Sequence, residues 1–370
     1  MAEFLAQSLN GLTLGALYAL VAIGYTMVFG IIKLINFAHG EFYMAGGFSG
    51  MLALVMLTGK GQPLEGIPGE AKLVLALALA AFAVGALAVI TERLAYRPIR
   101  SGGRIAALLT AVGVSMLLQN AGIAVFGARN IGFPETVGDD RYPRTAVKLS
   151  ELRAGEISDR KIEYWRTESA WMKQTLVNAG EPIQEKRLQD AIKTQPEHVY
   201  AVPAVTLHIK QIIIFVTLGI STFLLYLLVQ KTRIGRAMRA VSHDMQAASL
   251  MGINTNRIVA ITFSVGGGLA GVAGVLAGGM FISTVDPSMG FLFGLKAFIA
   301  AVLGGIGNIP GAVLGGLALG LIEQYSQHYA DTLLFSGAGA YRDAIAFMLL
   351  IMVLLIRPRG FFGRIEGEKV

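Results

Sequence analysis

Three polar side chains of different kinds lie close together near the start of the chain, in the stretch LINFAHGEFYMAGG (residues 34–47). Asn36, His39 and Glu41 bring an amide, an imidazole and a carboxylate together, with Gly40 between the last two. These groups could ligate a metal, line or gate a transport path, or occupy a loop between two helices. A metal site would need further ligands, for which the sequence offers no strong candidate. The other two interpretations stay open on this stretch alone.

The composition is that of an integral membrane protein. Of the 370 residues, 54% are hydrophobic and only 15% are charged, whereas soluble domains are about one quarter charged. Glycine is abundant, at 46 residues, as expected for helices that pack closely in lipid. Cysteine is absent, which excludes disulfides, thiolate metal sites and a cysteine nucleophile. The net charge of +7 comes from particular loops and does not indicate nucleic-acid binding.

Uncharged apolar runs predict an all-α, polytopic bundle of transmembrane helices. A helix rises about 1.5 Å per residue, so about 20 apolar residues cross a bilayer. The stretch GGIGNIPG (Gly304–Gly311) interrupts the last long run, and its asparagine, proline and glycines suit a turn or a pair of half-helices. We therefore predict about 8–9 spans. The predicted runs are Phe4–Ile32, Phe42–Gly59, Leu73–Thr91, Ile105–Ala128, Gln211–Gln230, Ile258–Val285, Ala297–Ile322 and Ala344–Ile356.

The placement of lysine and arginine predicts the orientation, because cytoplasmic loops are enriched in these cations. Four arginines lie between Arg93 and Arg104, five cations lie in the loop 231–257 against one acid, and three arginines follow Ile356. These segments should be cytoplasmic, which places the carboxyl terminus inside and the amino terminus in the periplasm. The predicted division is 1–128 with transmembrane helices 1–4, 129–205 as a soluble insert, 206–357 with the remaining helices, and 358–370 as a cytoplasmic tail.

The insert differs in kind from the rest of the chain. Residues 128–205 hold 12 basic and 12 acidic side chains, half of the 24 acids in the protein. The segments 150–165 and 181–193 combine helical spacing with mixed charge, which predicts solvated helix. Long loops translocate whatever their charge, and the span count places this segment outside. We therefore predict a helical extracytoplasmic insert.

Motifs for catalysis or cofactor binding are missing from the sequence. The five histidines are scattered, and no two of them are spaced as metal ligands on one helix face. Neither a G-x-x-x-x-G-K-[ST] nucleotide loop nor a G-x-S-x-G nucleophile motif occurs. The chain is therefore predicted not to be an enzyme, and to bind no metal or cofactor itself.

Glycines recur every fourth residue in two of the predicted spans. Such small residues let helix backbones approach, because lipid supplies no hydrophobic drive for helix pairing. The contact could be a sliding surface used in alternating access or a static packing surface; both interpretations make these spans helix–helix contacts. The glycines are Gly267, Gly271, Gly274 and Gly278 in one span and Gly307, Gly311 and Gly315 in the next.

The basic loop contains a candidate amphipathic helix over residues 236–254, for which Gly252 together with Asn254 supplies a stop signal. Its apolar face could dock into a partner's groove. Alternatively, it could lie on anionic lipid, held by Arg233, Arg236 and Arg239. The apolar stripe consists of Met238, Val241, Met245, Ala248 and Met251, at spacings of three and four.

Four blocks of sequence, read in order, resemble one protein family. They are NGLTLGALYALVAIGYTMVFGIIKLINFAHGEFYMAGG, ERLAYRPIR, GRAMRAVSHDMQAASLMGINTNRIVAITF and KAFIAAVLGGIGNIPGAVLGGLALG. These blocks are similar to the permease of bacterial branched-chain amino-acid ABC importers, the H-type subunit. The resemblance covers nearly the whole chain except residues 130–205.

The resemblance implies a set of partners and a mechanism. It implies a bacterial inner-membrane subunit that works by alternating access with an M-type permease, two cytoplasmic ABC ATPase subunits that use the ATP, and a periplasmic amino-acid-binding protein. It also implies a role in the path or its gating for Asn36, His39 and Glu41, with Gly40 supplying backbone freedom at a helix break. The segment implied to dock on the ATPase contains Arg236, Met238, Arg239, Asp244, Met245, Ala248, Met251 and Gly252.

Several alternatives remain open at this point. The substrate could be leucine, isoleucine and valine, a broader set of amino acids, or urea and amides. A secondary transporter or channel would follow an ion gradient and need no ATPase, and a scaffold would use the insert as its working part. The insert itself, longer than the family's usual loop, could contact the binding protein or the partner permease, or be a surface insertion without a transport role.

Overall fold

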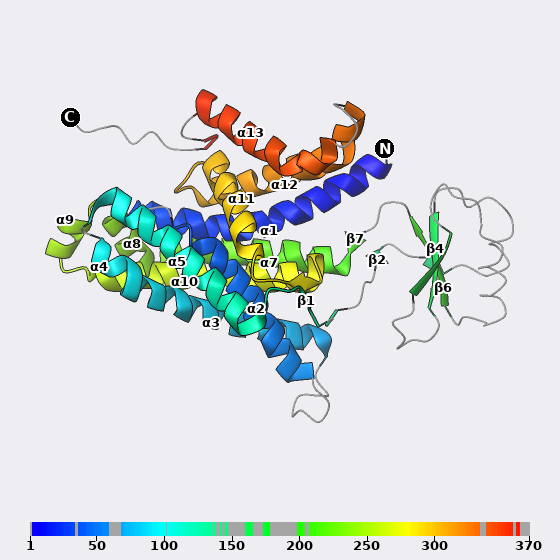
Figure 1. Cartoon of the computed structure of the whole chain (residues 1–370), viewed down its shortest axis with the longest axis horizontal. Helices are drawn as coiled ribbons and strands as arrows, with labels where there is room; N and C mark the ends of the chain where they lie inside the picture. Colours follow the sequence, from blue (N-terminus) through cyan, green and yellow to red (C-terminus); the bar gives the residue numbers. More distant parts are fainter. Residues whose placement is uncertain are drawn as a thin grey trace. The chain divides into compact units, whose positions relative to one another are not determined.

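The computed structural model of the chain consists of long helices and short strands (Figure 1). Two compact units are formed, one of residues 1–9 and 138–212 and the other, the membrane unit, of residues 10–137 and 213–370. The structure describes residues 2–33, 36–58, 68–100, 102–134, 136–137, 141–142, 145–146, 160–165, 173–177, 198–203, 207–333, 338–357 and 360–362.

Six apolar helical segments of the described chain are long enough to cross a membrane: Phe4–Ile32, His39–Leu57, Gly69–Ile99, Ile105–Phe126, Ile209–Lys231 and Thr255–Phe281. The polytopic helical architecture predicted from the sequence is confirmed, and the further crossings stay a prediction. The helical elements are α1 (Ala2–Ile32), α2 (His39–Thr58), α3 (Gly69–Thr91), η1 (Glu92–Tyr96), α4 (Arg97–Ile99), α5 (Gly103–Phe126), α7 (Ile209–Lys231), α8 (Arg233–His243), α9 (Met245–Leu250), α10 (Thr255–Leu276), η3 (Ala277–Phe281), α11 (Met289–Gly304), α12 (Ile309–Leu333), η4 (Ala338–Tyr341) and α13 (Arg342–Ile356).

The helices divide into an inner and an outer group. The spans of α1, α2 and α10 are 83%, 72% and 72% buried inside the chain, whereas those of α3, α5 and α7 are 33%, 22% and 17% buried. Large apolar side chains such as Phe82, Leu109 and Phe223 are exposed on the outer group. In water such surfaces would be unfavourable, so the outer helices are suited to face lipid or further subunits.

The predicted break within the run 297–322 lies between α11 and α12. Gly305 and Gly307 both adopt positive φ there, at 92° and 93°, a backbone conformation that favours glycine. Gly307 was expected among the packing glycines, and this expectation is wrong, because an added Cβ at Gly307 would meet nothing within 4 Å. The conformation of the turn, and not helix packing, requires glycine at this position.

The described part of the insert forms strands. The strands are β2 (Arg141–Tyr142), β3 (Thr145–Ala146), β4 (Arg160–Trp165), β5 (Lys173–Val177), β6 (His198–Pro203) and β7 (Leu207–His208). Antiparallel pairing gives one sheet in the order β3-β6-β4-β5 and a separate pair, β2-β7.

The helix predicted over 150–165 is therefore wrong at residues 160–165. Within RKIEYW, the residues KIEY (161–164) alternate between polar and apolar, a period of two that suits a strand. Its partner β6 is rich in valine and tyrosine, which favour sheets. The other predicted helix, at 181–193, lies outside the described residues. Residues 131–132 form β1 (Ile131–Gly132), which pairs with β8 (Thr284–Val285) in the membrane unit.

The single amphipathic helix predicted over 236–254 is replaced by two helices, α8 and α9. The chain becomes extended at Asp244, with φ −152° and ψ 113°. Its carboxylate accepts hydrogen bonds from the backbone N–H groups of Gln246 at 2.8 Å and Ala247 at 2.9 Å. An aspartate in this conformation is a strong helix N-cap, and its capping preference outweighs the continuous apolar stripe.

Candidate functional site

The polar cluster predicted at the start of α2 is enclosed by neighbouring helices. Asn36 is 4% exposed, and His39 and Glu41 are fully buried. The Tyr96 hydroxyl of η1 donates a hydrogen bond to Asn36 Oδ1 at 2.5 Å. The Ser115 hydroxyl of α5 donates to Glu41 Oε1 at 3.0 Å. The cluster thus ties the segment entering α2 to the arginine-rich end of α3 and to α5.

Part of the hydrogen-bonding capacity of this cluster is unused. Within the described part of the chain, Glu41 Oε2 is buried without a hydrogen bond, and the buried His39 ring packs against Tyr25 with centroids 4.4 Å apart. Buried polar atoms without partners are costly. Among the described residues, no three histidine or acidic side chains are grouped to hold a metal, so the structure gives the metal interpretation no support.

Gly40 lies where α2 meets α11. An added Cβ at Gly40 would lie under 3.0 Å from the carbonyl oxygen of Gly290 and from the Cα of Gly294. Its φ is not positive, and it belongs to the first turn of α2. The expectation that Gly40 supplies backbone freedom at a break is therefore wrong; glycine is needed here because two helix backbones come into contact.

We expect Gly40→Ala to destabilise the chain by about 1–3 kcal/mol, the usual cost of overpacking a tight contact. The extra methyl group would force α2 and α11 apart. Thermal unfolding of the detergent-purified chain would measure the change. Gly113→Ala is the matched control, because an added Cβ on this exposed glycine of α5 meets nothing within 4 Å. That control should be neutral or more stable by up to about 1 kcal/mol, and equal melting of Gly40→Ala and wild type would refute the packing role.

A chain of aromatic rings leads from the start of α2 to a second polar site. Tyr43 stacks on Phe293 of α11, with centroids 4.1 Å apart and planes 5° from parallel. Phe293 in turn packs against Tyr18 of α1, at 4.6 Å. The Tyr18 hydroxyl donates a hydrogen bond to Glu323 Oε2 of α12, at 2.7 Å. Direct contacts through Phe293 and Tyr18 therefore connect Tyr43 of α2 with Glu323 of α12.

The second site is an ion-pair network within the helical bundle. Lys296 Nζ of α11 lies 2.6 Å from Glu323 Oε1 and 2.7 Å from Asp343 Oδ1 of α13. Arg342 Nε lies 3.6 Å from Glu323 Oε1. Lys296 and Glu323 are only 7% and 3% exposed. Two cations and two carboxylates balance in charge, which permits burial that a single ion could not sustain.

Sequence reasoning missed this network. The predicted spans were drawn from one charged residue to the next, and the run beginning at Ala297 thus excluded Lys296. Lys296 is flanked on both sides by apolar residues of α11. A lone cation in an apolar helix is itself a signal for a buried partner, and Glu323 in α12 is its counterpart. The sequence contains both charged residues, but it does not show that they pair with each other.

Five of the six remaining predicted packing glycines lie in helix–helix contacts, and Gly278 packs against Val285 of strand β8. In α10, η3 and α12, an added Cβ at these positions would approach a neighbouring element to 3.0 Å or less. The contacts are Gly267 with Ala88, Gly271 with Ala80, Gly274 with Tyr43, Gly278 with Val285, Gly311 with Gly304, and Gly315 with Ala300.

Most of the apolar stripe predicted for docking is used inside the chain. Met238 is 1% exposed and Ala248 is 5% exposed, and Met245 is half-buried. Leu250 and Met251, by contrast, are 89% and 83% exposed. Leu250 was not on the predicted stripe. The break at Asp244 turns α9 relative to α8, and this change decides which apolar side chains stay free.

The predicted basic residues of this segment lie on the surface of α8. Arg236 and Arg239 are exposed, and Arg239 Nη1 donates a hydrogen bond to the carbonyl oxygen of Val229 in α7. Gly252 ends α9 with φ +81°, a conformation that favours glycine at a helix C-terminus.

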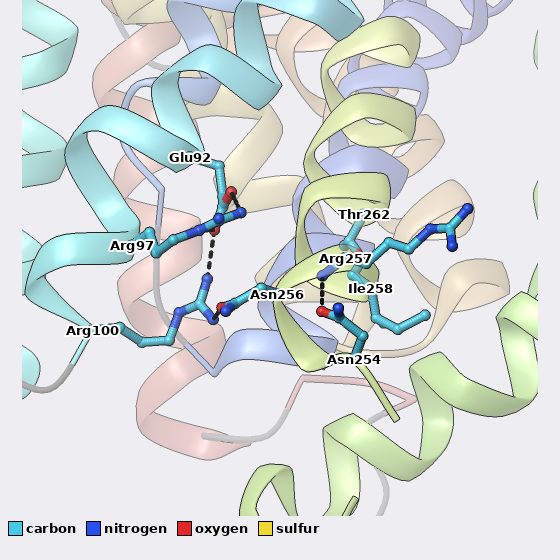
Figure 2. Close-up of polar contacts among 8 residues, drawn as sticks. All are labelled: Glu92, Arg97, Arg100, Asn254, Asn256, Arg257, Ile258 and Thr262. Carbon is cyan, nitrogen blue, oxygen red and sulfur yellow. Dashed lines mark hydrogen bonds and ion pairs between the residues drawn. The ribbon is translucent and has the colours of Figure 1, made fainter. Parts of the chain in front are cut away.

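A buried carboxylate organises the arginine-rich end of α3, as Figure 2 shows. Glu92 is fully buried and pairs with Arg97 at 2.8 Å and Arg100 at 2.6 Å. Arg100 also donates a hydrogen bond to Asn256 Oδ1 of α10, at 3.1 Å. Asn254 caps α10 by accepting from the backbone N–H of Arg257 at 3.0 Å. The cluster holds the end of α3 to the start of α10, the helix that follows α9.

A cavity of about 850 Å³ lies between α1, α7, α8 and the turn before α12. Its lining includes Thr26, Lys33, Tyr226 and Arg239. Asn36, His39, Gly40 and Glu41 do not line it. The predicted polar cluster is thus part of a helix junction rather than of this cavity's wall.

Comparison with known proteins agrees with this architecture. The family model "Branched-chain amino acid transport system / permease component" matches residues 7–149 and 173–354, and the unmatched 150–172 lie inside the predicted insert. The chain is similar to the permease BraD of Pseudomonas aeruginosa, 39% identical with 100% of this chain and 98% of that protein covered. It is 38% identical to LivH of Escherichia coli, with 99% and 98% covered. The ribose import permease RbsC of Escherichia coli is 30% identical, with 38% and 43% covered.

The fold and these matches define a multi-pass transport permease, not an enzyme. The chain belongs to the family of permease components of branched-chain amino acid transport systems.

Proposed function

We propose that this chain forms the translocation path for branched-chain amino acids in an ATP-driven importer. The observation that carries the proposal is the similarity, over 100% of the chain, to a protein named as a high-affinity branched-chain amino acid transport permease. The chain has no nucleotide-binding loop of its own, so hydrolysis would belong to two ATPase subunits. The other partners are an M-type permease and a periplasmic amino-acid-binding protein.

The segment α8–α9 is the proposed coupling site for the ATPases. Its exposed Leu250 and Met251 offer an apolar surface at the end of a short helix, a form suited to a partner's groove. Ile258 and Thr262 at the start of α10 are buried, so α9 is connected to the bundle through a firmly packed helix. A pull on α9 would therefore be transmitted to α10 and to the glycine contacts along it.

The polar cluster at the start of α2 is proposed to act in gating rather than in direct substrate contact. Its complete burial and its position outside the 850 Å³ cavity support this role. The unsatisfied Glu41 Oε2 faces Gly290 of α11, so a sliding movement between α2 and α11 would change its surroundings. Conformational change at such a junction is a two-state repacking of contacts.

The arginine distribution supports a proposed orientation in the membrane. The ends of α3 and α7, with α8 and α9, are proposed to lie in the cytoplasm together with the carboxyl terminus, and the amino terminus in the periplasm of a bacterial inner membrane. The sheet of the insert would then lie on the side of the binding protein and is its proposed contact.

Uptake in vesicles tests the proposed function. The chain would be reconstituted with candidate M-type, ATPase and binding-protein partners, and uptake of radiolabelled leucine, urea and ribose compared with and without ATP. We expect ATP-dependent leucine uptake. Uptake of urea or ribose alone would change the substrate, and uptake that ignores ATP and follows an ion gradient would overturn the ABC mechanism.

A further inference from the structure

A groove of about 480 Å³ runs between the end of α3 with η1 and the first turns of α10. One end is basic: Arg93 and Arg97 lie on one side of it, and Asn254, Asn256 and Arg257 on the other. Figure 2 shows Arg97 and Arg257 on opposite sides of Asn256. The groove mouth is therefore lined by arginines from two different elements, although the side chain of Arg257 extends away from Arg97 (Figure 2).

The acids that the structure describes balance only part of the charge at this mouth. The single carboxylate of Glu92 is already shared between Arg97 and Arg100. Within the described residues, the side chains of Arg93 and Arg257 have no ion-pair partner. Asn254 caps α10, a helix of 22 residues, whose amino-terminal dipole adds positive potential. Guanidinium groups provide planar donors that match phosphate oxygens, so the mouth is suited to a phosphate group.

The other end of the groove is mainly apolar. Its lining continues along Val89 on one wall and along Ala260, Ile261 and Ser264 on the other. Helical rise places Val89 about 12 Å from Arg97 along the helix axis, and Ser264 about 15 Å from Asn254 along α10. Both walls belong to candidate membrane spans. A free phosphate would use only the mouth, whereas a phospholipid would also place an acyl chain along this seam.

We propose that this groove binds an anionic phospholipid, with its phosphate at Arg93, Arg97 and Arg257 and an acyl chain along the seam of α3 and α10. Juxtamembrane arginines attract anionic lipids by electrostatics, and the apolar walls belong to candidate membrane spans that acyl chains would contact. A bound lipid would connect the end of α3 with the helix that follows α9. This site is independent of the transported substrate and of ATP.

Lipid retention by the purified transporter complex tests the proposal. Native mass spectrometry would compare phosphatidylglycerol with phosphatidylcholine of identical acyl chains, for wild type and for Arg93→Gln/Arg257→Gln. We expect preferential retention of phosphatidylglycerol, weakened about 10- to 30-fold in the double variant. The control variant is Arg129→Gln. It removes an exposed arginine that lies just beyond the carboxyl end of α5 and outside the groove, and it should leave lipid retention unchanged.

Two further variants separate a lipid groove from simple surface attraction. Ser264→Leu would fill the apolar end and should abolish cross-linking of a diazirine-labelled acyl chain to residues 89–97 or 254–264, although the arginines are unchanged. Arg93→Lys/Arg257→Lys keeps the charge and should retain part of the binding, provided that both variants purify and melt as wild type does.

Four outcomes would overturn the proposal. Three of them are equal retention of the two lipids, unchanged retention in Arg93→Gln/Arg257→Gln, and displacement by inorganic phosphate without any acyl-chain cross-link. Cross-links that appear with this chain alone but not in the complex would mean that a partner subunit covers the groove, which also rejects a resident lipid.

Discussion

Leu250→Ala/Met251→Ala is expected to lower ATP-driven leucine uptake at least tenfold while the chain remains folded. The two side chains are 89% and 83% exposed, so their removal leaves no cavity in the isolated chain. Burial of one large apolar side chain against a partner contributes about 1.5–3 kcal/mol. Loss of both corresponds to a hundredfold or larger drop in affinity for the ATPases, at about 1.4 kcal/mol per factor of ten. Vesicle uptake and copurification of the ATPases would measure both effects.

The matched control is Leu355→Ala/Ile356→Ala. These adjacent apolar residues at the end of α13 are 80% and 73% exposed, but they lie outside the coupling segment. Their loss should leave ATPase copurification unchanged. If the Leu250/Met251 variant keeps its ATPases and its uptake, the coupling surface lies elsewhere on the chain, and the family assignment is unaffected.

Lys296→Met is expected to destabilise the chain by about 3–5 kcal/mol, the usual cost of removing one partner of a buried ion pair. Methionine has a similar length, so packing is largely kept, but Glu323 and Asp343 would face each other without the cation that lies 2.6 and 2.7 Å from them. Thermal unfolding followed by fluorescence-detected size-exclusion chromatography would measure the loss. Lys231→Met, at an exposed lysine of α7, should melt as wild type does.

A second substitution distinguishes lost charge balance from lost volume. In Lys296→Met/Glu323→Gln the glutamine can still accept the Tyr18 hydrogen bond, and one unpaired carboxylate is removed. We expect this double variant to recover a substantial part of the stability, because neutralising a whole pair costs less than breaking it. A double variant less stable than Lys296→Met would mean that Glu323 supports the fold through contacts other than this ion pair.

The sequence could predict those features that depend on local composition. Runs of apolar residues specify membrane helices wherever they occur, because a bilayer requires about 20 of them and internal hydrogen bonding of the backbone. The predicted break over Gly304–Gly311 likewise follows from local chemistry, since glycine adopts backbone conformations that other residues avoid and proline lacks the N–H that a helix interior needs. The family, too, could be identified from ordered blocks of sequence.

Local patterns misled where two of them competed. Residues 160–165 carry mixed charge that suits a solvated helix, yet alternation within RKIEYW and pairing with β6 gave a strand. Residues 236–254 carry a continuous apolar stripe, yet the capping of α9 by Asp244 divided it. In both segments a hydrogen-bonding pattern decided the structure. The spacing of apolar residues carries no information about the strength of that pattern.

The sequence by itself therefore determined the membrane class, the family and most of the helices of the bundle, since these depend on composition read along the chain. Only the tertiary structure decided what the polar residues do. It brought Tyr18 to Glu323 across 305 positions and Lys296 to Glu323 across 27, and it placed Gly40 against the backbone of α11. The physical reason is that the effect of a buried charge, or of a glycine without a side chain, depends on the residue that it contacts. Only the packing of the helices determines which residue that is.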